Sequence, residues 1–261
     1  MTTVATTSVL PSYSVLGVRV NAVQIPEVIA QMEAWIALRD RCRYVAVTGM
    51  HGITEAQHHR HFKEVLADAD LVVADGMPLV WLGRRKGHAM PRRVYGPELM
   101  QEFWSRTSSR RYRHFFYGGA PGVAAELERR FTEAFPNHAV AGTFSPPFRP
   151  LTASEDREIV ATINHSRPDV LWVGLGTPKQ EQWMHDHRNA LQVAVMVGVG
   201  AAFDFHAGAV RQAPAWMGDH GLEWLFRLVQ EPRRLWRRYL IRGAEFAALV
   251  CLELGGFRKF D

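Results

Sequence analysis

The sequence predicts an α/β fold, a Rossmann-like and mostly parallel sheet with helices on both faces. Short apolar runs alternate with helical patterns along the chain, and most of these runs end at a glycine. Runs that are apolar at every position are typical of parallel strands, because helices cover both faces of such a sheet. With 261 residues, 47% of them hydrophobic, the chain can bury a full core.

The elements follow from these runs in chain order. Strands are expected over residues 15–20, 44–47, 71–74, 114–117, 139–140, 170–173 and 193–199. Helices are expected over residues 26–38, 53–67, 77–82, 97–109, 122–135 and 154–166. Pro26 and Pro97 stand at expected helix starts, where the missing N–H of proline costs nothing.

The strand at residues 71–74 runs directly into Asp75 and Gly76. Ligands of open α/β sheets bind outside the carboxyl ends of the strands, so Asp75 would project into the ligand crevice. Asp is also a favoured N-cap, and Asp75 could serve only to start the next helix. This stretch by itself favours neither role.

Three glycine-rich turns, at residues 118–122, 174–176 and 198–200, follow expected strands. Main-chain N–H groups at such turns suit a diphosphate, although tight turns alone would explain any one of them. None completes a GxGxxG fingerprint, because the sixth place is Phe203 or Lys179, and no P-loop is present. The candidate substrate contacts at these turns are Gly118, Gly119, Gly174, Gly176 and Gly200.

Pro178 is followed by three polar side chains, Lys179, Gln180 and Glu181, at an expected helix start. An acid there could simply cap the helix. Together with Asp75, a lysine and an amide would instead suit a sugar nucleotide, the cation for phosphate and the amide for hydroxyls. We favour this second interpretation.

The chain changes character near residue 213, and we expect a catalytic domain over residues 1–213 and a helical appendage over 214–261. Residues 232–242 hold five arginines and no acid, among Trp and Leu side chains. Such a basic amphipathic segment favours docking on an anionic membrane surface, with an ordinary packed hairpin or an oligomer surface as the alternatives. The candidate membrane or diphosphate contacts are Arg227, Arg233, Arg234, Arg237 and Arg238.

Net charge, cysteine content, a DxD-like pair and the N-terminal sequence narrow the range of possible partners, metal sites and locations. The net charge of +5 favours an anionic partner. Cys42 and Cys251 lie far apart, so neither a disulfide framework nor a zinc site is expected. Asp68 and Asp70 mimic a metal-holding DxD but precede their strand, so we expect a structural role and no metal. Residues 1–14 lack a signal-peptide pattern, which indicates a cytoplasmic protein or one on a membrane surface.

Several segments together resemble the WecG/TagA/CpsF family of bacterial glycosyltransferases. They are residues 74–76, 93–96, 118–119, 174–181, 198–204 and 222–227, in the order and approximate spacing of the family over about residues 15–242. The PKQE and GVGAAFD segments are the most specific. The resemblance implies a metal-independent, inverting enzyme that transfers a sugar from UDP onto a sugar on a polyprenyl diphosphate, at the inner face of the plasma membrane.

The resemblance also implies roles for single residues. Asp75 matches the proposed general base, and Thr48 and Arg93 match other positions around the pocket. Gln180 and Asp204 match substrate and nucleotide contacts. From the residues alone, without the resemblance, we would interpret Arg93 as part of a solvated basic loop.

One position departs from the family, which usually has asparagine two places after the threonine, where this chain has Met50. The donor sugar therefore stays open between UDP-glucose and a UDP-N-acetylmannosamine type, as do the acceptor linkage and any homo-oligomer. A Rossmann oxidoreductase is the weaker alternative because the fingerprint is missing. A nucleic-acid binder is weaker too, because the arginines cluster at one end and no helix-turn-helix, RRM or zinc-finger pattern is present.

Overall fold

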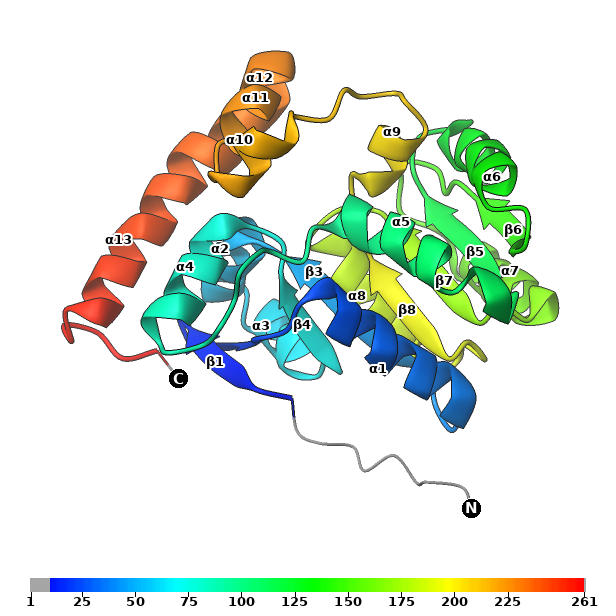
Figure 1. Ribbon diagram of the computed structural model, residues 1–261, viewed down its shortest axis with the longest axis horizontal. Coiled ribbons are helices and arrows are strands. Elements are labelled where there is room, and N and C mark those ends of the chain that lie inside the picture. Colours follow the sequence, from blue (N-terminus) through cyan, green and yellow to red (C-terminus); the bar gives the residue numbers. More distant parts are fainter. Residues whose placement is uncertain (1–9, 261) are drawn as a thin grey trace.

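The computed structural model describes residues 10–260. Its centre is an eight-stranded sheet in the order β1-β2-β4-β3-β8-β7-β5-β6, in which β1 and β2 pair antiparallel and all other neighbours pair parallel (Figure 1). The expected α/β fold is therefore confirmed. The strands are β1 (Ser12–Val15), β2 (Val18–Asn21), β3 (Arg43–Thr48), β4 (Leu71–Ala74), β5 (Arg113–Gly118), β6 (Ala139–Phe144), β7 (Val170–Gly174) and β8 (Val195–Gly198).

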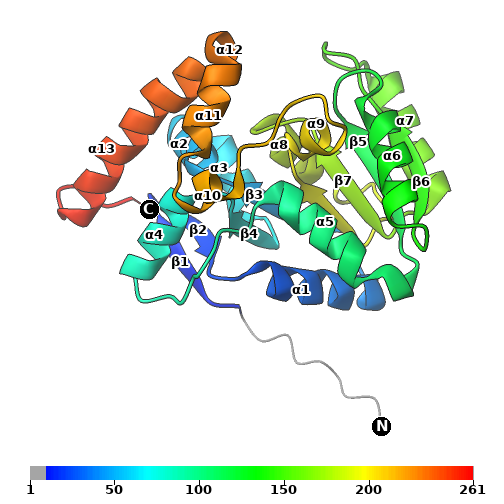
Figure 2. The same cartoon turned by 45° about the horizontal axis from the view of Figure 1, so that its top comes forward.

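Helices cover both faces of the sheet (Figures 1 and 2). They are α1 (Ile25–Leu38), α2 (Met50–His58), α3 (Arg60–Ala67), α4 (Met77–Arg85), α5 (Gly96–Arg106), α6 (Val123–Ala134), α7 (Ala153–Ser166), α8 (Lys179–His187), α9 (Ala202–His206), α10 (Ala215–Asp219), α11 (Glu223–Gln230), α12 (Pro232–Trp236) and α13 (Arg242–Leu254). A 3₁₀ turn, η1 (Ser108–Arg110), follows α5, and a π-helical turn, η2 (Arg237–Ile241), joins α12 to α13.

The central strands are buried on both faces, as their apolar sequences predict. Along β3, Tyr44 and Ala46 point into one core cluster, and Val45 and Val47 point into the other. The first cluster includes side chains from α2, α3, α4, α7, α8 and α13, and the second includes side chains from α1, α5, α6 and α9. This two-sided burial makes the sheet the rigid base on which the strand ends are held.

The C-terminal helices are joined to this core. In Figure 1, α11, α12 and α13 run along one side of the molecule, and α13 descends next to α2 and α4. Phe246 and Val250 of α13 belong to the first core cluster. His58 of α2 contacts Glu245 of α13. The division into two parts at residue 213 stays a prediction.

Three expected elements differ in detail from the structure. The single strand over residues 15–20 is a hairpin, because Leu16 and Gly17 have φ angles of 49° and 74° and turn the chain between β1 and β2. The helix over residues 53–67 is two helices, since His59 has the extended angles φ −125° and ψ 99°. The strand near residue 139 extends to Phe144. The N-terminal stretch expected to lack a signal peptide falls largely outside the described residues.

Candidate functional site

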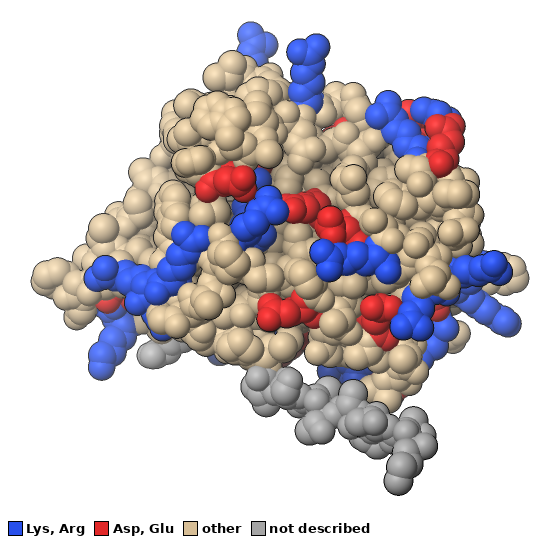
Figure 3. All heavy atoms as spheres, viewed as in Figure 1, with Lys and Arg blue, Asp and Glu red and all other residues tan. Residues whose placement is uncertain are grey.

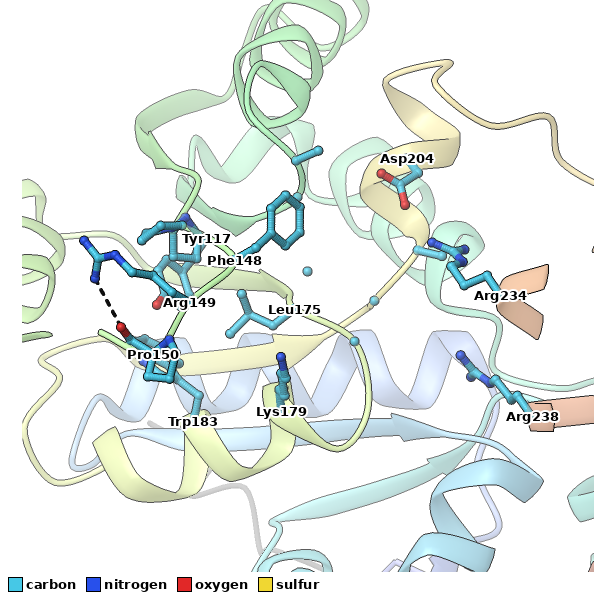
Figure 4. Close-up of a pocket in the computed structure, with 18 of the residues that line it drawn as sticks. Tyr117, Phe148, Arg149, Pro150, Leu175, Lys179, Trp183, Asp204, Arg234 and Arg238 are labelled. Carbon is cyan, nitrogen blue, oxygen red and sulfur yellow. Dashed lines mark hydrogen bonds between the residues drawn. The ribbon is translucent and has the colours of Figure 1, made fainter. Parts of the chain in front are cut away.

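A cavity of about 1540 Å³ opens at the carboxyl ends of the parallel strands. Its lining comes from the ends of β5 and β7, the turn after β8, the start of α8, the loop at residues 146–152 and the C-terminal helices. Figure 4 shows Tyr117, Phe148 and Trp183 at one end and Arg234 and Arg238 at the other. This is the position where open α/β sheets bind ligands, as the sequence predicts.

The predicted glycine turns meet at this cavity, and their glycines have two different roles. One allows close packing of two strands, and the others expose main chain to the cavity. An added Cβ at Gly118 would lie 2.6 Å from the carbonyl of Gly174, and Gly118 has a φ of +127°. Gly118 is therefore needed for the approach of β5 to β7. Gly176 and Gly200 also have positive φ angles, and they line the cavity together with Gly119 and Gly174. Main chain free of side chains is thus presented to the cavity at three strand ends.

The C-terminal helices form a basic wall of the cavity. Its arginines are Arg227, Arg234, Arg237, Arg238 and Arg242. Four of the five predicted arginines are thus brought together, whereas Arg233 lies outside the lining. Burial lowers the pKa of Arg238, and its Nε atom is buried without a hydrogen-bond partner. A partly buried, incompletely paired guanidinium favours an anionic ligand at this wall.

Asp204 of α9 lies at the same end of the cavity as Arg234 (Figure 4). Burial raises the pKa of this carboxyl, while the charges of Arg234 and Arg227 oppose that effect. An acceptor beside arginines suits the hydroxyl groups of a ligand whose phosphates the arginines bind.

The three predicted polar residues at the start of α8 have different environments: one is exposed at the cavity and two are buried. Lys179 is exposed and lines the cavity. Gln180 and Glu181 are buried beneath it, where the Gly176 N–H donates to Gln180 Oε1 at 3.1 Å and the Gln180 amide donates to Glu181 Oε1 at 2.9 Å. Glu181 Oε2 is buried without a partner, and burial raises the pKa of this carboxyl. In this structure Gln180 and Glu181 therefore hold the glycine turn in place.

Asp75 lies at the end of β4, as predicted. Its main-chain N–H donates to the carbonyl of Thr48 at 2.9 Å, and its Oδ1 accepts from the Gly96 N–H at 3.1 Å. Part of its surface remains exposed, but the surrounding protein desolvates the carboxyl enough to raise its pKa. The charge of Arg93 opposes this increase. A carboxyl with a raised pKa at a strand end is suited to accept a proton.

Arg93 lies over Asp75 on the loop before α5. Its Nη1 donates to the main-chain carbonyl of Asp75 at 3.3 Å, and its Nη2 pairs with Glu223 of α11. The guanidinium carbon lies 4.0 Å from the centre of the Tyr95 ring. The predicted closeness of Arg93 to Asp75 is thus present, and its ion pair with Glu223 could not be inferred from the sequence.

Thr48 ends β3 beside Asp75, and its hydroxyl is buried without a hydrogen-bond partner. An added Cβ at Gly52 would lie 2.0 Å from Thr48 Oγ1, so glycine is required where α2 crosses this strand end. Thr48, Asp75 and Arg93 cluster together, next to the large cavity but outside its lining residues.

His51 is a cavity residue that sequence reasoning missed. It lies in the first turn of α2, lines the cavity and has a buried Nδ1 without a partner. Burial, together with the charges of Arg238 and Arg242, lowers the pKa of His51 to about 4, so the ring is neutral at pH 7. The sequence feature that could have pointed to His51 is its position three residues after Thr48. Tyr117, Phe148 and Trp183 gave no such signal, because aromatic residues also form cores.

The DxD-like pair lies at the start of β4, at the opposite end of that strand from Asp75. Asp70 accepts from the Tyr44 N–H and from Arg41, while Asp68 contacts His185. These contacts fit the structural role expected of both residues. Among residues 10–260, no group of three or more His, Cys, Asp or Glu side chains is arranged to hold a metal ion.

No helix in the described part of the chain has both the length and the apolar character needed to cross a membrane.

Comparison with known proteins gives a consistent result. The model of the Glycosyl transferase WecG/TagA/CpsF family matches residues 13–259. The chain is 34% identical to an N-acetylglucosaminyldiphosphoundecaprenol N-acetyl-beta-D-mannosaminyltransferase of Bacillus spizizenii, over 71% of this chain and 70% of the relative. Proteins of the same name from Bacillus subtilis (31% identical, 69% of this chain and 68% of the relative) and Staphylococcus aureus (27%, 85% and 86%) also match. The chain belongs to the WecG/TagA/CpsF family and is a glycosyltransferase.

Proposed function

We propose that this protein transfers a sugar from a UDP-sugar, with inversion, onto a sugar carried by a polyprenyl diphosphate in the synthesis of a bacterial envelope polymer. The observation that carries the proposal is the Asp75 carboxyl, which has a raised pKa at a strand end, next to a cavity with an arginine wall. The names of the relatives describe transfer of N-acetylmannosamine to a diphosphoundecaprenol-linked N-acetylglucosamine.

In the proposed step, a hydroxyl of the acceptor sugar attacks the anomeric carbon of the donor. Asp75 takes the proton of that hydroxyl, the new C–O bond forms, and the bond from the anomeric carbon to the β-phosphate oxygen breaks. UDP leaves with the electron pair of that bond. General-base assistance of this kind contributes about 10²–10⁴-fold to a rate.

The departing diphosphate needs positive charge and N–H donors. We assign this role to the main chain at the glycine turns, to Lys179 and to the arginine wall. Because these groups can supply the required charge, the proposed reaction needs no metal. We assign Asp204 to contacts with the nucleotide hydroxyls. We assign Thr48, Gln180 and Glu181 to the part of the site that holds the donor sugar.

The proposed partners include the inner surface of the plasma membrane, where the lipid-linked acceptor resides. Leu225, Val229, Trp236, Leu240 and Ile241 are exposed large apolar side chains on α11, α12 and η2. In Figure 3 the surface over this part is mostly uncharged, with Lys or Arg side chains projecting above it. This combination supports docking of residues 214–261 on an anionic lipid surface.

The test is a transfer assay with purified protein, an N-acetylglucosamine diphosphate on a short lipid as acceptor, and a panel of donors. UDP-N-acetylmannosamine, UDP-N-acetylglucosamine and UDP-glucose are compared by the release of UDP, with and without EDTA, and the product is analysed by NMR for its anomeric configuration. We expect one donor to react with inversion and without dependence on metal. UDP release no faster than that of Asp75→Asn, for every donor, would refute the proposal.

A further inference from the structure

The guanidinium of Arg93 lies between two acidic residues. Glu223 takes its ion pair through Nη2, while Nη1 faces the main-chain carbonyl of Asp75 and not its carboxylate. The side chains of Arg93 and Glu223 are only 14% and 13% exposed. The second carboxylate oxygen of Glu223 accepts from the Tyr95 hydroxyl at 3.2 Å. Both oxygens of Glu223 are thus used to fix this corner of the site.

Three neighbours confine the guanidinium of Arg93. The Tyr95 ring stacks on one side of it, with its centre 4.0 Å from the guanidinium carbon. Gly218 of α10 lies close enough that an added Cβ would be 2.6 Å from Arg93 Nη2. Glu223 closes the arrangement from α11. Two of these three neighbours belong to the C-terminal helices.

This position matters for a carboxylate that must accept a proton. An arginine paired directly with a carboxylate lowers its pKa by about 1–3 units and occupies its lone pairs, which weakens it as a base. Arg93 pairs with Glu223 in place of a direct pair with the Asp75 carboxylate, although its charge still lowers the pKa of Asp75. The negative charge of Glu223 also acts on Asp75 directly, and it raises the pKa of the Asp75 carboxyl.

We propose that Glu223 is a positioning residue for sugar transfer, which holds Arg93 against the main chain of Asp75 and so leaves the Asp75 carboxylate free to act as the base. The inference rests on the proposed function. It also means that the base is completed only when α11 is docked. The C-terminal helices would then contribute to the chemistry itself as well as to the wall of the cavity.

The groups with the largest effect on the charge of Asp75 come from three parts of the chain. Arg93 and the Gly96 N–H come from the loop before α5 and the start of α5, Glu223 comes from α11, and Arg238 comes from η2. Glu223 is the acid among them. Burial and the charges of Glu223 and Asp75 raise the pKa of the neighbouring Tyr95 hydroxyl. The variant Glu223→Gln keeps the size and an acceptor oxygen but removes the charge, so the remaining arginines act on Asp75 unopposed.

The experiment compares wild type, Glu223→Gln and Glu223→Asp by pH–rate profiles and by ¹³C NMR titration of the Asp75 carboxyl, whose signal is identified by its loss in Asp75→Asn. For Glu223→Gln we expect a lower pKa of Asp75, an acid limb of kcat/KM displaced to lower pH, and a kcat reduced about 3- to 10-fold. Glu223→Asp should keep the Asp75 titration nearer to that of wild type, because the charge is retained.

Asp219→Asn is the matched control. Asp219 is a carboxylate of α10 that pairs with Arg92 at 3.4 Å and is 49% exposed, so its loss should leave both readouts unchanged. An unchanged Asp75 titration in Glu223→Gln overturns the inference, whatever sugar is transferred. If Glu223→Gln does not fold, Glu223→Ala takes its place, and an unchanged Asp75 titration in that variant overturns the inference. If wild type transfers no sugar while the titration moves as expected, the proposed function fails and the effect of Glu223 on Asp75 stands.

Discussion

At the scale of single residues, the site holds a carboxyl in surroundings that penalise its charge. Burial raises the pKa of Asp75, so the ionised form costs stability above that raised pKa. This cost disappears as the pH falls toward the value of an unfolded aspartate, about 3.9. Such a penalty supports the proposed role of Asp75 in the reaction rather than a role in stability.

Replacing Asp75 with asparagine should therefore separate activity from stability. We expect Asp75→Asn to lose at least about 100-fold in transfer rate, because the variant lacks the proposed general base. We also expect it to melt at a higher temperature than wild type at pH 7, with a difference that shrinks as the pH is lowered to 4. Transfer assays and thermal melts at several pH values measure both effects. Near-normal turnover, or a lower melting temperature at pH 7, would contradict this account.

Gly52 offers a second test at the same scale. A Cβ there would lie 2.0 Å from Thr48 Oγ1, so Gly52→Ala must displace the end of β3 or the first turns of α2. We expect Gly52→Ala to lose most transfer activity and about 1–3 kcal/mol of stability from overpacking.

Gly49→Ala is the control for Gly52, since the nearest atom to its added Cβ is 3.9 Å away and its φ of −113° suits any residue. It should keep its activity and lose at most about 1 kcal/mol through a poorer N-cap. Equal activity in the two variants would show that the position of Thr48 does not matter.

At the scale of elements, the sequence predicted the strand ends better than the contacts between distant segments. Asp75, the glycine turns and the start of α8 were found because apolar runs end in polar or glycine residues, and topology then brings those ends together. The pairing of Arg93 with Glu223 spans 130 positions in the sequence, and no local pattern carries it. The break at His59 was missed for a similar reason, since neither glycine nor proline marks it.

The prediction at the scale of elements concerns how much the packing of helix α13 on the core contributes to stability. Phe246 is buried in the core cluster that also holds side chains of α2 and α4. We expect Phe246→Ala to lower the free energy of unfolding by about 3–5 kcal/mol, as for other buried phenylalanines. Phe257→Ala, at a side chain that is 83% exposed, should cost less than about 0.5 kcal/mol in the same urea titrations. A small effect of Phe246→Ala would contradict the view that this side chain fixes α13 to the core.

At the scale of the whole molecule, the C-terminal helices combine positive charge with exposed apolar side chains. The basic cavity wall and the exposed apolar side chains of α11, α12 and η2 both belong to the segment after residue 213. A water-exposed apolar surface next to arginines is costly unless a partner covers it. The lipid on which the acceptor is carried is the proposed partner.

Arg233 tests this arrangement without disturbing the cavity, because it is exposed on α12 and outside the cavity lining. Each arginine near an anionic surface is worth about 1 kcal/mol, so Arg233→Glu should weaken binding to phosphatidylglycerol vesicles about 5-fold or more. Arg157→Glu, an equal charge reversal at an exposed site of α7, should bind like wild type. Vesicle flotation at low and high salt measures the difference, which salt should reduce by screening. Equal partitioning of the two variants would place the lipid contact elsewhere on the molecule and remove the reason for the exposed apolar side chains of α11, α12 and η2.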